Sequence, residues 1–370
     1  MKVPFMRSLL TFSLVLVCSF GSANIARAEE LQPKFQTVVD KGLDFLAKNQ
    51  ARDGHWEGNG GQYPTTITAL CGLAMLMEGS TIREGKHAER IRKAVDWLMD
   101  RCQRNGLIGN SNNPTESQRY MYGHGYGLLF LAQVYGDEDD VDRRKKLEQI
   151  LTRAVDFCGK AQTPRGGWGY LTSADGGGFD EGSVTITQVQ ALRAAKNAGI
   201  VVPKSIIDNA NEYLKKCTTE RGGIIYSLAH GGAFNGAERP PLTAAAVACS
   251  FNSGEYGSGL AKKWIHYCQT SIPIDNSGRD SFGYWEYTHY YFSQAIYTLG
   301  DDGYAKLFPD SKPAERLNWT KYRQVIFDYL ASRQASDGSW SQGYIGAPFT
   351  TACHLTILQL DKAALPIYQR

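Results

Sequence analysis

A glycine-centred turn recurs six times along this chain, each time between two segments with helical character. In the three clearest copies a glutamine is followed by a glycine four residues later and a tryptophan two residues after that: Gln50–Trp56, Gln162–Trp168 and Gln334–Trp340. Weaker copies centre on Gly106, Gly222 and Gly283, so that successive glycines lie 52 to 61 residues apart. A period of this length indicates a repeat architecture in which neighbouring units bury a shared core.

Each turn joins two segments whose apolar residues recur at helical spacing, which predicts twelve helices and no strands. The first helix of a pair keeps charged residues, whereas the second, as in 70–77 and 243–249, is apolar around most of its circumference and should be buried on several sides. Thr65 and Thr66 are expected to cap the helix that follows them. The expected ranges are 38–50, 67–77, 91–102, 120–135, 147–161, 184–198, 206–217, 242–251, 261–269, 287–299, 322–333 and 349–360.

An inner ring of the apolar helices inside an outer ring of amphipathic ones accounts for both compositions. Six hairpins can close such a ring, and closure buries the ends that an open array would need to cap. We therefore expect an all-α fold, an α6/α6 toroid of six helical hairpins, forming a single domain over residues 29–370.

The first 28 residues have the features of a secretory signal peptide. Lys2 and Arg7 precede the apolar run 9–20, and a small-x-small cleavage signal ends at Ala28. The run is short for a membrane anchor, although a retained N-terminal anchor is the alternative. We expect an exported protein, periplasmic or extracellular, with no membrane span in the mature chain. Cleavage removes three basic residues and brings the formal net charge from +3 to zero, which argues against a nucleic-acid partner.

The cysteines suit packing better than cross-linking. Three of them recur within the second helix of their repeats, as small apolar packing residues do, so buried free thiols are favoured over a disulfide framework. Their odd number leaves at least one unpaired in any case. No cysteine or histidine set has the spacing of a zinc site, and we expect no metal and no cofactor. The seven cysteines after residue 28 are Cys71, Cys102, Cys158, Cys217, Cys249, Cys268 and Cys353.

At its three clearest turns the chain resembles the prenyltransferase and squalene-cyclase (terpenoid cyclase) repeat proteins, whose Gln–Trp motif these residues reproduce. The resemblance covers essentially all of residues 29–370 and implies an α/α toroid. It also implies structural roles: the glutamine bonds helix-end groups, the glycine permits the tight turn, and the tryptophan covers the junction with the next repeat. Four tryptophans are therefore expected to be packing residues: Trp56, Trp168, Trp285 and Trp340.

The catalytic residues of that family are not reproduced in the matching places. Its cyclases protonate their substrate with an Asp-x-Asp-Asp cluster just before an inner helix, whereas the string Asp137–Asp140 follows one and is better interpreted as a solvated turn. Its protein prenyltransferases hold zinc with Asp-x-Cys and a histidine that opens the last inner helix, where this chain has Phe349–Thr351. The thioester motif of complement-type toroids is absent too. Whether the protein is an enzyme stays open.

A site is expected at the side of the ring where the second helices begin. Their N-termini face a common mouth, and unpaired N–H groups and helix dipoles there favour anionic or oxygen-rich ligands. Three long loops, 106–119, 169–183 and 224–241, lie on this mouth and are candidates for binding loops, with plain surface loops as the alternative.

Polar and aromatic residues gather at the same helix starts. A histidine near a carboxylate in an aromatic cavity could transfer a proton, although a structural histidine bonded to a neighbouring hydroxyl is the alternative for any single one. The candidate catalytic residues are His124, His289, Glu286, Asp180 and Glu181. The candidate ligand contacts are Tyr122, Tyr126, Trp285, Tyr287 and Tyr290.

These features favour an exported toroid whose central cavity binds an apolar or isoprenoid-like small molecule. The alternatives are a non-catalytic periplasmic protein-interaction module, which implies a protein partner, and a glycan-active enzyme. A deep cavity lined by Tyr126, His124 and His289 would favour the first. A ring plugged by side chains would favour the second, and a suitably spaced carboxylate pair across an open cleft would favour the third.

Overall fold

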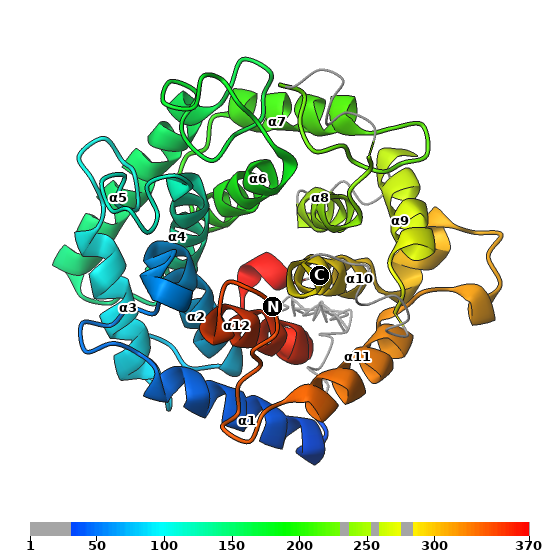
Figure 1. Ribbon diagram of the computed structural model, residues 1–370, viewed down its shortest axis with the longest axis horizontal. Helices are drawn as coiled ribbons and strands as arrows, with labels where there is room; N and C mark the ends of the chain where they lie inside the picture. The colour runs from blue at the N-terminus through cyan, green and yellow to red at the C-terminus, as the bar shows by residue number, and fades with distance from the viewer. Residues whose placement is uncertain (1–30, 230–236, 253–258, 275–283, 370) are drawn as a thin grey trace, which may run out of the picture.

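The computed structural model describes residues 31–229, 237–252, 259–274 and 284–369, and within them the chain forms twelve α-helices in two concentric rings (Figure 1). The outer helices are α1 Pro33–Lys48, α3 Ala88–Asp100, α5 Val141–Ala161, α7 Lys204–Cys217, α9 Gly259–Ser271 and α11 Trp319–Arg333. The inner helices are α2 Pro64–Glu78, α4 Tyr120–Tyr135, α6 Gly182–Asn197, α8 Pro240–Asn252, α10 Trp285–Leu307 and α12 Ala347–Gln359. In these residues the only β structure is a set of isolated bridges.

The inner helices form a closed ring. Each packs against the two neighbouring inner helices, and α12 completes the circle by packing against both α10 and α2. In Figure 1 the first outer helix, α1, lies beside the last, α11, and the two are in contact. The predicted all-α toroid of six helical hairpins is confirmed.

The turn glutamines connect consecutive repeats. The side-chain amide of Gln50 donates to the carbonyl of Arg90 in α3 over 2.9 Å, and that of Gln162 donates to the carbonyl of Ile206 in α7 over 3.0 Å. The amide of Gln334, in the last repeat, donates to the carbonyl of Val38 in α1 over 2.8 Å. The same bond that joins neighbouring hairpins therefore also joins the last hairpin to the first.

The turn tryptophans, by contrast, hold their own hairpin together. The Trp340 indole N–H donates to the carbonyl of Leu330 in α11, and its backbone N–H donates to Thr351 Oγ1 in α12. Trp56 and Trp168 repeat both bonds in their own hairpins. The expected packing role is thus correct for these three, but the glutamine rather than the tryptophan makes the hydrogen bond to the next repeat.

Most helix boundaries lie within three residues of the expected ones, and α4 matches its expected range at both ends. The largest difference is at α10, which ends at Leu307 rather than at 299, and α5 and α1 begin six and five residues earlier than expected. The expected threonine caps of α2 are wrong. The helix begins at Pro64, so Thr65 and Thr66 lie inside it, and the preceding residue, Tyr63, adopts a left-handed backbone conformation with φ of 54°. Tyr284 precedes α10 in the same conformation, with φ of 69°. A non-glycine residue held there is strained, and such strain is often found at binding sites.

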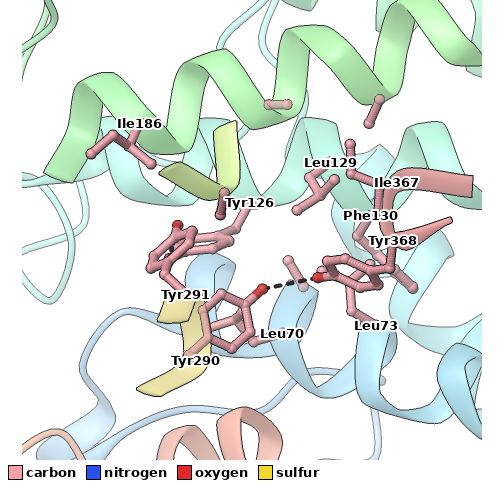
Figure 2. Packing of buried hydrophobic residues seen from close by; sticks show 14 of the residues in the cluster. Leu70, Leu73, Tyr126, Leu129, Phe130, Ile186, Tyr290, Tyr291, Ile367 and Tyr368 are labelled. Atoms are coloured by element: carbon pink, nitrogen blue, oxygen red, sulfur yellow. Dashed lines mark hydrogen bonds between the residues drawn. The ribbon is translucent and has the colours of Figure 1, made fainter. Parts of the chain in front are cut away.

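The segment after α12 fills the centre of the ring. Since α12 ends at Gln359, the chain enters from the end where the inner helices finish. Ile367 and Tyr368 are buried there among inner-helix side chains (Figure 2), and the hydroxyls of Tyr368 and Tyr290 lie 3.1 Å apart. This segment gives the ring a floor.

All seven cysteines after residue 28 are free, and all but the half-buried Cys102 are buried, which confirms the expected free thiols. Among the described helices none is long and apolar enough to cross a membrane. The expected signal peptide, residues 1–28, lies outside the described residues and stays a prediction.

Candidate ligand-binding cavity

A cavity of about 1110 Å³ opens at the side of the ring where the inner helices begin. Ten of its 22 lining residues are aromatic, and aliphatic residues come from α2, α8 and the loop before α12: Ile67, Leu242 and Ile345. The rest are two prolines, a glycine and six polar or charged residues. A large concave, mostly apolar cavity with a few polar groups is typical of small-molecule sites. The aromatic residues are Tyr63, Tyr122, Tyr126, Tyr170, Phe179, Tyr226, Tyr284, Tyr287, Tyr344 and Phe349.

The three long loops supply much of this wall, as expected. Arg119 comes from the first, Tyr170 and Phe179 from the second, and Tyr226 and Glu238 from the third. Within the third loop, positions 230–236 lie outside the described residues.

Three of the five predicted ligand contacts line the cavity. The Tyr122 hydroxyl lies 2.5 Å from Ser183 Oγ, and the Tyr126 hydroxyl lies 3.0 Å from that of Tyr291. The hydroxyl of Tyr287 is buried near Ser183. Burial raises the pKa of all three tyrosines well above the ordinary value, so they present neutral phenols to a ligand.

The other two predicted contacts do not line the cavity. Trp285 packs against His289, with ring centroids 4.2 Å apart, and against Tyr329 on α11. Tyr290 belongs to the floor through its hydroxyl contact with Tyr368. Both lie on α10, where the sequence pattern does not distinguish the face toward the cavity from the faces toward other helices.

The expectation that the cavity contains histidines is wrong. Nδ1 of His124 accepts the backbone N–H of Ile108 over 3.2 Å, and its ring packs against Phe157 of the outer helix α5. Nδ1 of His289 lies 2.8 Å from the hydroxyl of Tyr322 on the outer helix α11. Burial lowers the pKa of each histidine to about 3, so both are neutral near pH 7. Both histidines therefore have the structural role that the sequence analysis gave as the alternative to proton transfer.

Two of the three candidate carboxylates hold the loops and helix ends together. Asp180 is fully buried, accepts the Tyr213 hydroxyl over 2.9 Å and pairs with Arg165. Glu181 caps α6, since its carboxylate accepts the backbone N–H of Val184 over 2.7 Å, and burial raises its pKa. Neither is part of the cavity wall.

The third candidate, Glu286, lies on the first turn of α10 and does line the cavity. It is mostly buried, and its carboxylate lies beside Gly343. The second wall carboxylate, Glu238, forms an ion pair with Arg221, whose Nη1 lies 3.2 Å away, and accepts the Thr219 hydroxyl.

Two arginines of the wall were not predicted as site residues. The Arg119 guanidinium lies 4.7 Å from the ring centroid of Tyr170, and that of Arg239 lies 6.0 Å from the ring centroid of Tyr226. The two tyrosine hydroxyls are hydrogen-bonded to each other. A sequence signal did exist: Arg119 and the Arg239–Pro240 step stand where α4 and α8 begin, and the residue before an inner helix lies on the mouth.

Comparisons with known proteins agree with this architecture. The squalene-hopene cyclase C-terminal domain matches residues 23–127. Human lanosterol synthase is 29% identical over 93 residues, and this match spans 25% of the chain but only 13% of the synthase. The resemblance to squalene cyclases is confirmed.

Solved structures similar to this squalene-cyclase-like toroid have low sequence identity and show the fold alone. A variant of the type II terpene cyclase MstE from Scytonema, in complex with its substrate geranylgeranyl dihydroxybenzoate, has a TM-score of 0.59 at 12% identity, covering 90% of this chain and 98% of the cyclase. An inactive variant of the α-1,6-mannanase GH76A of Salegentibacter sp. HEL1_6, in complex with α-1,6-mannotriose, has a TM-score of 0.63 at 9% identity, covering 89% and 99%.

The acidic string of this toroid lies away from the cavity. Asp140 caps α5 by accepting the backbone N–H of Arg143, and Glu138 pairs with the Arg143 side chain over 2.9 Å. Asp139 is exposed and Asp137 is partly exposed. The interpretation of Asp137–Asp140 as a solvated turn is correct for its three aspartates, whereas Glu138 is buried. Among the described residues no group of three or more His, Cys, Asp or Glu side chains is placed to hold a metal ion.

Proposed function

We propose that the protein binds an apolar or isoprenoid-like small molecule in the cavity at the mouth of the ring. The observation that carries this proposal is the cavity of about 1110 Å³, whose wall contains ten aromatic residues. Within the described residues the centre of the ring is filled at its floor and hollow at its mouth, which favours a ligand-binding protein over an interaction module whose centre is plugged. A terpene cyclase of the same fold binds a geranylgeranyl compound, which is consistent with this ligand class.

The wall favours an apolar ligand for a direct physical reason. The rings of its tyrosines offer extended apolar surface from which a hydrocarbon chain displaces water. Burial of each CH₂ group contributes about 0.8 kcal/mol before the costs of association. Affinity should therefore rise with the number of isoprene units until the cavity is full.

Catalysis is not part of this proposal. Cyclisation in the resembling family begins with protonation by an acid cluster, and the only comparable string in this chain, Asp137–Asp140, lies in a turn at the opposite end of the inner helices. Residues 1–28 predict export, so we propose that the protein binds its ligand outside the cytoplasm.

The experiment measures binding of geraniol, farnesol and geranylgeraniol to the purified protein by titration calorimetry, with native mass spectrometry to report stoichiometry. We expect one ligand per chain and tighter binding as the chain lengthens. Ile345→Trp places an indole in the cavity from a loop and should weaken binding at least tenfold. The matched control is Val201→Trp, at a position that is 84% exposed and outside the cavity, which should bind as the native protein does. No binding of any of the three alcohols would refute the proposal.

A glycan is the second candidate ligand, because the mannanase with this fold binds α-1,6-mannotriose and the cavity wall here carries two carboxylates, Glu238 and Glu286. Tyr284 and Tyr344, both more than half exposed at the mouth, could stack on sugar rings. The same titration with α-1,6-mannotriose separates the two: saturable binding of the trisaccharide without binding of the alcohols would favour this second function.

A further inference from the structure

At the mouth of the cavity, Arg119 is a cation without a counter-charge among the described residues. Its guanidinium lies over the Tyr170 ring, and Tyr63, Tyr122 and Tyr344 are close enough to interact with its charge. In this part of the chain no carboxylate forms an ion pair with it and no acceptor takes a hydrogen bond from its side chain. The side chain is half-buried, so solvation by water is incomplete.

An arrangement of this kind is incomplete without a ligand. The ring faces of tyrosines attract the cation, but they leave the five guanidinium N–H donors unused. These donors have a rigid planar fork that matches the two oxygens of a carboxylate.

The other charges of the wall limit how much negative charge a ligand can carry. Arg119 and Arg239 are the basic residues of the wall, and Glu238 and Glu286 are the acidic ones, so the wall has no formal net charge. Arg239 directly follows Glu238 in the chain, whereas neither chain neighbour of Arg119 is acidic. A diphosphate would bring several negative charges into a cavity whose wall has no formal net charge and includes Glu286. The other wall carboxylate, Glu238, is already paired with Arg221 outside the wall. A single negative charge placed against Arg119 is enough to balance that guanidinium.

We propose that Arg119 is the headgroup subsite of the cavity and that the ligand is an apolar chain ending in a carboxylate. This inference rests on the proposed function, which it deepens by naming the polar end of the ligand. The chain would lie against the tyrosine rings and aliphatic residues, while the carboxylate would accept two N–H bonds from the guanidinium at the mouth.

The test compares four probes: farnesol, farnesoic acid and farnesyl diphosphate, which share one hydrocarbon chain, and acetate, which lacks it. Their affinities are measured by titration calorimetry at pH 7.5 on the native protein, on Arg119→Gln and on Arg119→Lys. The matched control is Arg333→Gln, because Arg333 also lies over a tyrosine ring, that of Tyr329, but outside the cavity. Thermal unfolding of each variant shows whether it is folded.

We expect farnesoic acid to bind the native protein and Arg333→Gln at least tenfold more tightly than farnesol, and acetate to bind only weakly. Arg119→Gln should abolish this preference, while Arg119→Lys should retain part of it. Equal affinity for acid and alcohol, a preference that survives Arg119→Gln, or tighter binding of the diphosphate than of the acid would each overturn the inference. Farnesol binding without an acid preference would refute this inference alone, whereas no binding of any farnesyl probe would also refute the proposed function.

Discussion

The strongest test of the closed ring is the hydrogen bond between its last and first repeats. Gln334 donates to the carbonyl of Val38 over 2.8 Å and to that of Gly338 over 2.9 Å. Gln50 makes the corresponding bonds to Arg90 and to its own turn glycine over 2.9 and 2.8 Å. The substitutions Gln334→Ala and Gln50→Ala therefore both remove these two contacts, and Gln50→Ala also removes a long bond of 3.5 Å that Gln50 Oε1 accepts from Arg90.

The size of the effect follows from these contacts. Each intramolecular hydrogen bond contributes roughly 0.5–1.5 kcal/mol net, and the glutamines are half-buried, so water only partly replaces the lost donor. We expect each substitution to lower the free energy of unfolding by about 2 kcal/mol. Gln103→Ala, in a weaker copy of the turn, is a graded control. Its amide donates to one carbonyl, that of Gly109, and its loss should cost about 1 kcal/mol.

Urea unfolding followed by far-UV circular dichroism gives the comparison, with all variants measured at one protein concentration. In a closed ring Gln334→Ala costs as much as Gln50→Ala. In an open superhelix the Val38 partner would be absent, and Gln334→Ala would cost only about half as much. A difference of about 1 kcal/mol or more between the two variants would therefore contradict the closed ring.

Three further predictions concern the turn, the buried histidines and the floor. Gly338→Ala should lower the free energy of unfolding in urea by about 3 kcal/mol or more, because φ is +91° and an added Cβ would lie 2.2 Å from the Lys41 carbonyl oxygen. Gly79→Ala, at φ of +111° with no atom within 4 Å of the added Cβ, should lower it by only about 1 kcal/mol. Equal costs would contradict the close approach. The folded-state pKa of about 3 for His124 and His289 lies below the unfolded value of roughly 6.5. As the pH falls, the unfolded chain therefore takes up protons before the folded protein does. The free energy of unfolding should drop by about 2 kcal/mol per histidine between pH 7.5 and 5. NMR titration of either ring near pH 6.5 would refute this. A double-mutant cycle of Tyr290→Phe and Tyr368→Phe should give a coupling of about 1 kcal/mol from their hydroxyl contact, and additive effects would show that the floor does not depend on it.

The candidate site shows what a sequence pattern leaves undecided on a helix buried all round. Tyr122, Tyr126 and His124 lie on the same inner helix, α4, within five residues of one another. Two of them line the cavity, whereas His124 faces the outer helix α5. Because α4 is apolar on nearly every side, periodicity could identify the helix but not its rotation about its own axis. His289 on α10 was misplaced for the same reason.

The loops show a second limit. Their length and position on the mouth were predictable, and so was the gathering of polar residues at the helix starts. Which loop side chains turn inward was not, because Arg119 and Tyr170 come together only where the first and second long loops meet. Asp180 was misplaced because its partners come from segments 15 to 48 residues away in the chain.

The spacing of the Gln, Gly and Trp residues was sufficient to establish the repeat and the helical hairpins, because each turn is held mainly by bonds among residues close in the chain. The distribution of charged and apolar residues likewise predicted which helices form the outer ring and which form the inner ring. The number of hairpins made a closed ring the expectation. The contacts that close it, the floor made by Ile367 and Tyr368, and the shape and charge of the cavity depend on how six hairpins are rotated against one another. Those contacts join residues as far apart as Val38 and Gln334, so only the folded chain decides them.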